Sequence, residues 1–189
     1  MTAEPFEAML TGGHPNSLGR TLEVVDSVLA EPARLEDLYA CYRSDDAVVR
    51  LRTSNAVKRI SRQHPEWLVP FIDRLLSEIA DLDQASAQWT LAELCLTLKP
   101  FMDAVQQAHA LAVLQRNLAQ HTDWIVLNTT MQVLADWEPA DADLRQWLRP
   151  HFERLSGDSR GSVARRAAKL LASLTRRING TQMNTEQHG

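Results

Sequence analysis

The chain has 189 residues, of which 44% are hydrophobic and 23% charged, the profile of one soluble globular domain. Its formal net charge of −4 disfavours a protein whose whole surface binds nucleic acid, although it leaves local basic patches open. No apolar run approaches the roughly 20 residues that cross a bilayer, and the first residues lack a secretory signal pattern, so we expect a cytoplasmic protein.

Helical periodicity runs through almost the whole chain after residue 16, with short polar breaks between segments. Residues 1–16 concentrate Gly, Pro and Asn towards their end, and we predict an N-terminal arm or loop that either caps the first helix or recognises a ligand. Apolar stripes typical of helices then cover 18–29, 35–42, 48–60, 67–79, 87–98, 105–118, 126–137, 144–155 and 163–174. We therefore predict an all-α domain over 17–176, followed by a disordered tail over 177–189.

Several breaks between the stripes carry residues that begin helices. Asp46 and Asp123 each precede an apolar stripe in the position of an N-cap, and Pro32 stands where a helix would begin. Helices joined by such short loops pack against their neighbours in antiparallel pairs.

A nine-residue segment recurs in the chain at an interval of eighty residues. Trp67–Leu75 and Trp147–Leu155 are identical at five of the nine positions, including Pro70 and Pro150. Self-similarity at a fixed offset is typical of a repeat protein.

The second helix of each predicted pair aligns with the others in the same way. The apolar set of residues 49, 53, 56, 57 and 60 reappears after steps of 38, 39 and 37 residues. Four units of this period, with two helices each, are typical of two-helix solenoids.

The segment Asp46-Ala47-Val48-Val49-Arg50, with Ala56-Val57 after it, resembles the second helix of a HEAT repeat, and Pro70 and Pro150 stand where that family often has a proline. The resemblance covers roughly 32–176. It implies a right-handed α-solenoid of about four two-helix units with an N-terminal capping helix. The second unit departs from the pattern, with Gln84 and Gln88 at the expected Asp and Arg.

In that family the second helices line a concave side, and the resemblance implies a groove there. Counting 100° per residue from the apolar centre of each second helix places one set of polar side chains on the opposite side. This predicted binding set is Arg52, Asn55, Arg59, Arg62, Trp89, Glu93, Gln132, Asp136, Arg166, Lys169 and Arg176. It is basic at both ends and neutral to acidic in the middle, although such charges are often simply solvated.

This pattern favours a non-catalytic scaffold that grips a protein or peptide partner, without a cofactor. The alternative is a nucleic-acid-binding protein, because basic ends also suit a phosphate backbone. One HEAT-like group excises alkylated bases with concave tryptophans and an acidic residue, and Trp89 with Glu93, together with Asp136, resembles such an arrangement.

Other chemistry finds little support in the sequence. The six histidines show no metal-ligand spacing, so we expect no metal site. Cys41 and Cys95 each lie within an apolar helical pattern, and we predict free, buried thiols.

Overall fold

The computed structural model describes residues 4–14 and 17–186, with the backbone alone for residues 140 and 177–186. Within those residues the chain forms helices and no strand, which confirms the all-α prediction. The chain divides into two compact units, Met1–Val113 and Leu114–Gly189.

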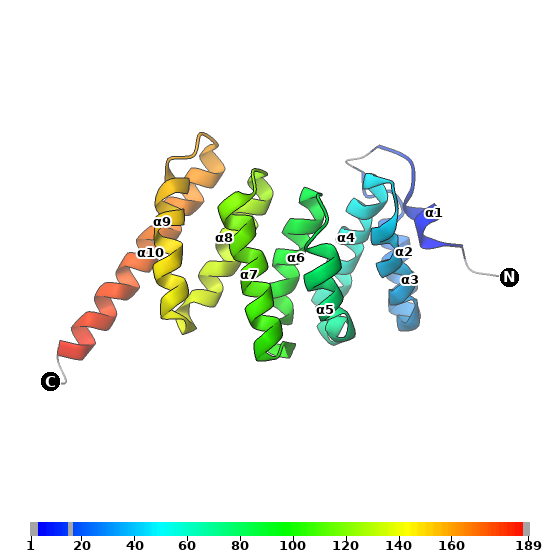
Figure 1. Cartoon of the computed structure of the whole chain (residues 1–189). Helices are drawn as coiled ribbons and strands as arrows, with labels where there is room; N and C mark the ends of the chain where they lie inside the picture. Colours follow the sequence, from blue (N-terminus) through cyan, green and yellow to red (C-terminus); the bar gives the residue numbers. More distant parts are fainter. Residues whose placement is uncertain (1–3, 15–16, 187–189) are drawn as a thin grey trace. The chain divides into compact units, whose positions relative to one another are not determined.

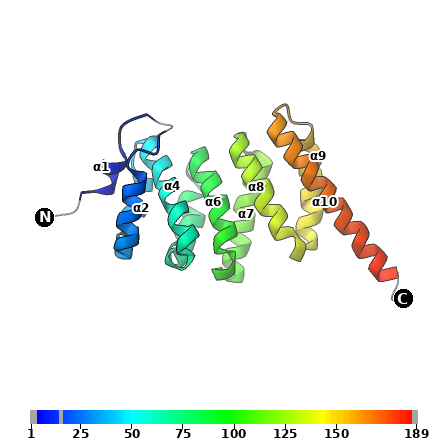
Figure 2. The same cartoon turned by 180° about the vertical axis from the view of Figure 1, so that it is seen from behind.

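The first unit contains three helices that lie side by side in one layer. These are α2 (Thr21–Ala30), α4 (Ala47–Gln63) and α6 (Ala85–Leu98), of which α2 and α6 both pack on α4 (Figure 2). The unit also contains α1 (Phe6–Leu10), α3 (Leu35–Ala40), α5 (Ile72–Arg74) and the start of α7 (Ala104–Gln120), within which the division between the units falls.

The N-terminal arm is part of the core of this unit. Phe6, Met9 and Leu10 on α1 are buried, and α1 packs against α2 and α4. The arm thus covers apolar surface at the first helices, as the capping interpretation requires.

The segment between α4 and α6 is a composite helix. A 3-10 stretch over Pro65–Phe71 leads into α5 and then into a π-helical stretch over Leu75–Ile79. Pro70 lies inside the 3-10 stretch, where its missing N–H and bulky ring disfavour α-helical bonding. The related Pro150 lies instead within the continuous α9 (Ala142–Ser156), so the repeated nine-residue segment adopts two local structures.

The second unit contains α8 (Trp124–Trp137), α9 and α10 (Gly161–Glu186). Figure 1 shows α9 and α10 alongside each other, and α10 also packs on α8. We predicted a disordered tail over 177–189, but the backbone is helical through Glu186, and residues 187–189 lie outside the described residues. Residues 177–186 have no apolar stripe, but extending an existing helix costs much less free energy than nucleating one. The helix therefore continues through them.

The structure confirms the N-caps predicted at Asp46 and Asp123, which begin α4 and α8, and most of the predicted apolar faces. The Asp46 carboxylate accepts from the Val48 amide at 2.8 Å, and that of Asp123 from the Ile125 amide at 2.8 Å. The apolar faces of α4, α6, α8 and α10 are buried, including Val57, Leu94, Val133 and Ala167, although Leu171 on α10 is only half-buried. In the stripe predicted over 18–29, we expected Leu18 and Leu22 to be buried, but both are exposed, and Val24 lies in the core.

Candidate binding surface

The residues of the predicted binding set lie on α4, α6, α8 and α10, and they differ in exposure and in hydrogen-bond partners. Arg52 was predicted to be exposed, and this is wrong: the side chain is 2% exposed. Its guanidinium donates to the carbonyl oxygens of Leu10 (2.6 Å), Gly12 (2.6 Å), His14 (3.2 Å) and Ser17 (3.1 Å). The N-terminal loop therefore covers Arg52 and removes it from any surface for a partner. A helical periodicity calculation cannot include this loop, because the loop lies more than thirty residues away in sequence.

Further along α4, Asn55 and Arg59 are half-buried and bonded to each other. The Arg59 Nε donates to Asn55 Oδ1 at 2.8 Å, which holds the guanidinium along its own helix. These side chains lie on one face, as predicted, with limited exposure.

Glu93 on α6 forms ion pairs with two cations of α4. Its carboxylate accepts from Lys58 Nζ at 3.5 Å and from an Arg62 terminal nitrogen at 3.0 Å. Of the cations that we predicted for this end of the surface, Arg62 is therefore paired with a carboxylate within the protein. Trp89, one turn before Glu93, is half-buried.

In the second unit a hydrogen-bonded chain links α8 with α10. Arg166 donates to Gln132 Oε1 at 3.1 Å, and Gln132 Nε2 donates in turn to Asp136 Oδ1 at 3.0 Å. Arg166 and Asp136 are exposed and Gln132 is half-buried. The structure thus brings three members of the predicted set together.

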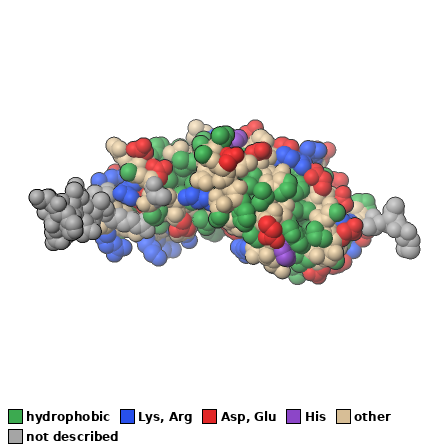
Figure 3. Space-filling view, turned by 90° about the horizontal axis from the view of Figure 1, so that it is seen from below, with side chains coloured by type: hydrophobic (Ala, Val, Ile, Leu, Met, Phe, Trp, Pro, Cys, Tyr) green, Lys and Arg blue, Asp and Glu red, His purple; other side chains and the backbone are tan. Residues whose placement is uncertain are grey.

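These residues adjoin a shallow pocket of about 450 Å³ in the second unit. The lining includes the cation Arg165 and the polar Ser162, which do not belong to the predicted binding set. The complete lining is Gln132, Ser162, Arg165, Arg166, Lys169 and Leu170. It contains three cations and no carboxylate. Figure 3 shows Lys and Arg side chains close together beside the C-terminal helices, towards the left of the view.

Sequence reasoning could have found Arg165 and Ser162. Residues 162, 165, 166 and 169 follow the i, i+3, i+4, i+7 spacing of one helix face, displaced slightly from the face we counted. Arg176 is exposed as predicted but lies two turns beyond Lys169 and outside the lining.

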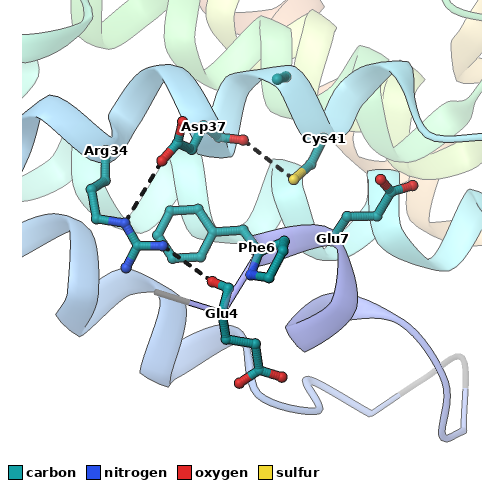
Figure 4. A pocket seen from close by; sticks show the side chains of 8 residues that line it. Glu4, Phe6, Glu7, Arg34, Asp37 and Cys41 are labelled. Carbon is teal, nitrogen blue, oxygen red and sulfur yellow. Dashed lines mark hydrogen bonds and ion pairs between the residues drawn. The ribbon is translucent and has the colours of Figure 1, made fainter. Parts of the chain in front are cut away.

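A second pocket, of about 510 Å³, lies in the first unit between the start of the chain and α3. Its wall includes Arg34, whose guanidinium lies 3.9 Å above the Phe6 ring centre and 3.7 Å from an Asp37 carboxylate oxygen (Figure 4). Cys41 lines the same pocket, but its side chain is buried and its Sγ donates to the Asp37 carbonyl oxygen. Burial raises the pKa of this thiol to about 11, which keeps it protonated at neutral pH.

Cys95 is free and buried like Cys41, as predicted, and burial raises the pKa of its thiol to about 12. Across residues 4–14 and 17–186, no group of three or more His, Cys, Asp or Glu side chains has the arrangement of a metal site. In the same part of the chain, no helix combines the length and the apolar content that a membrane crossing needs.

Comparisons with protein-family models, with curated proteins and with solved structures give no match to this chain.

Proposed function

We propose that this chain is a non-catalytic binding protein, a right-handed α-solenoid of about four HEAT-like units that grips an acidic segment of a protein partner. The partner would lie along the outward side of α8 and α10 in the second unit, with its acidic groups on the cations of α10. The observation that carries the proposal is the pocket beside Arg165, Arg166 and Lys169, whose lining has no carboxylate to neutralise them.

The repeat architecture is supported by the sequence spacing of side-chain contacts within each unit. In the first unit, Arg50 contacts Gln84 across 34 residues and Arg74 contacts Glu36 across 38. In the second, Arg166 contacts Gln132 across 34 residues and Arg154 contacts the Leu118 carbonyl across 36. Contacts at this separation are expected when units of about 38 residues each touch the next.

A binding role without catalysis is supported by the state of the reactive groups. Both thiols are buried with raised pKa values, and Glu93, the acid that we compared with a glycosylase acid, is held in ion pairs with Lys58 and Arg62. Such a carboxylate is poorly placed to act as a general base, because its two oxygens already contact Lys58 and Arg62.

The proposal is tested with a fluorescein-labelled twelve-residue peptide rich in Asp and Glu, by anisotropy at about 50 mM salt. The double variant Arg166→Glu/Lys169→Glu is expected to bind about ten-fold more weakly or worse, because it reverses two contact charges. The matched control Arg43→Glu/Arg149→Glu changes the net charge equally but alters cations outside the pocket lining, and it should bind like the wild type.

Equal weakening in both variants would show a general charge effect and overturn the proposal, as would absence of binding by the wild type. A single-stranded oligonucleotide of equal charge forms the other arm. Tighter binding of the oligonucleotide, with an affinity that falls steeply with salt, would favour the nucleic-acid alternative instead.

A further inference from the structure

We infer that the pocket between α8 and α10 takes a phosphomonoester, presented by a phosphorylated serine or threonine of the protein partner. This inference rests on the function proposed above and names the group that the cationic end of the surface recognises.

The donors come from one helix face and point to one volume. Ser162, Arg165, Arg166 and Lys169 occupy successive turns of α10 at a spacing that places them on a single side, and all line the pocket of about 450 Å³. Asn128 Nδ2 lies 3.5 Å from Ser162 Oγ and donates to it, which leaves the hydroxyl hydrogen to donate towards a ligand.

Arg166 is oriented by α8 before any ligand arrives. Gln132 accepts one of its N–H groups at 3.1 Å and is itself held by Asp136 at 3.0 Å. A guanidinium fixed through one nitrogen keeps its remaining donors directed, so less conformational entropy is lost when an anion binds.

The cations of the pocket repel one another. Arg165 and Lys169 are four residues apart, and Arg166 and Lys169 three, spacings at which like charges destabilise a helix. Asp136 contacts the group only through Gln132, and no carboxylate belongs to the lining. An anion in the pocket would relieve this repulsion.

Among common biological anions, a phosphomonoester matches the donors best. It carries about −1.5 to −2 charges at neutral pH and three acceptor oxygens, enough to bridge two cations and the Ser162 hydroxyl. A carboxylate has one charge and two oxygens, and a single arginine saturates it. A nucleic-acid backbone instead requires a track of many phosphate contacts, which a chain of net charge −4 supplies poorly.

The test uses three synthetic peptides that differ at one position, which holds phosphoserine, glutamate or serine within the same short acidic sequence. Anisotropy and amide chemical-shift mapping are measured on the full chain. We expect the phosphoserine peptide to bind at least ten-fold more tightly than the glutamate peptide and to shift the amides of Ser162, Arg166 and Lys169. The variant Arg165→Gln/Arg166→Gln should remove this preference, and Arg149→Gln should keep it.

The pH dependence of the preference for the phosphoserine peptide distinguishes phosphate binding from general charge attraction. The second pKa of a phosphomonoester is about 6, so the phosphoserine preference should fall between about pH 7.5 and 5.5 as the group takes up a proton. The pocket lining contains no histidine, and its charged groups are Arg165, Arg166 and Lys169, with Asp136 behind Gln132.

The outcomes separate this inference from the function on which it rests. Equal binding of the phosphoserine and glutamate peptides overturns the phosphate inference and leaves the acidic-partner function standing. If none of the three peptides binds, both are overturned. Binding of the phosphoserine peptide with shifts confined to other helices, or unchanged in Arg165→Gln/Arg166→Gln, also overturns the inference.

Discussion

Gly19 lies directly against the guanidinium of Arg52. A Cβ built on Gly19 would stand 2.9 Å from Arg52 Cζ and 3.0 Å from its Nη1, closer than packed atoms approach. Gly19 also has a φ of 51°, in the left-handed region that favours glycine. The glycine therefore allows the loop to close over a buried arginine, and the arginine in turn bonds the carbonyl groups of that loop.

Replacing Gly19 with alanine is expected to destabilise the protein by about 3 kcal/mol, from left-handed strain and displacement of Arg52 from its carbonyl bonds. Gly12→Ala is the matched control, since Gly12 has a φ of 73° but nothing within 4 Å of the added carbon. That control should cost only about 1 kcal/mol. Urea unfolding measures both, and equal losses would show that the contact with Arg52 is unimportant.

A buried ion pair in the second unit gives a second prediction. Glu138 is 0% exposed and accepts from the Arg145 guanidinium, whose side chain is 21% exposed. Arg145→Met should cost about 3 kcal/mol, because it leaves a buried carboxylate without this partner. On the same helix, Arg149 pairs with Glu153 at 3.4 Å with both side chains about half exposed, and Arg149→Met should change the free energy of unfolding by less than about 0.5 kcal/mol. Similar losses in the two variants would contradict this account.

His151 makes the stability of the second unit depend on pH. Its ring stacks on Trp147 with centroids 3.9 Å apart, and burial, with a smaller contribution from Arg154, lowers its pKa from the ordinary 6.5. Below about pH 6.5 the unfolded chain then binds more protons than the folded one, so stability is complete above that pH and falls as the pH drops towards the lowered pKa. Unfolding midpoints at about pH 7.5 and 5.5 should differ more in the wild type than in His151→Phe, which keeps an aromatic ring beside Trp147. An unchanged difference would assign the pH dependence to other groups.

Glu93 is expected to restrain anion binding on the first unit, because it holds both Lys58 and Arg62. Glu93→Gln should raise the affinity for the acidic peptide about three-fold, and it should change stability by less than about 1 kcal/mol, since ion pairs near the surface contribute little. Glu78→Gln is a close control. Glu78 also forms ion pairs with two cations, Arg43 and Arg74, but it lies in the π-helical stretch between α4 and α6. A gain of affinity in both variants would reflect net charge alone.

Much of the candidate surface followed from periodicity. Arg166, Gln132 and Asp136 were placed on one side of their helices by counting residues, and they lie in one hydrogen-bonded chain. Arg165 and Ser162 were missed because the count on this helix began at Arg166, although both lie within about one turn before it. The ion pairs of Glu93 with Lys58 and Arg62 were not predicted, since they depend on how closely two helices approach.

The sequence by itself determined the helices, their caps and their buried faces, because these depend on residues within one or two turns of each other. Asp46, Asp123 and the apolar stripes of α4, α6, α8 and α10 are examples. The tertiary structure alone decided which charges stay available, because burial and ion pairing join residues thirty or more positions apart. It covered Arg52 with a loop that ends at Gly19, and it left the cations of α10 around an open pocket.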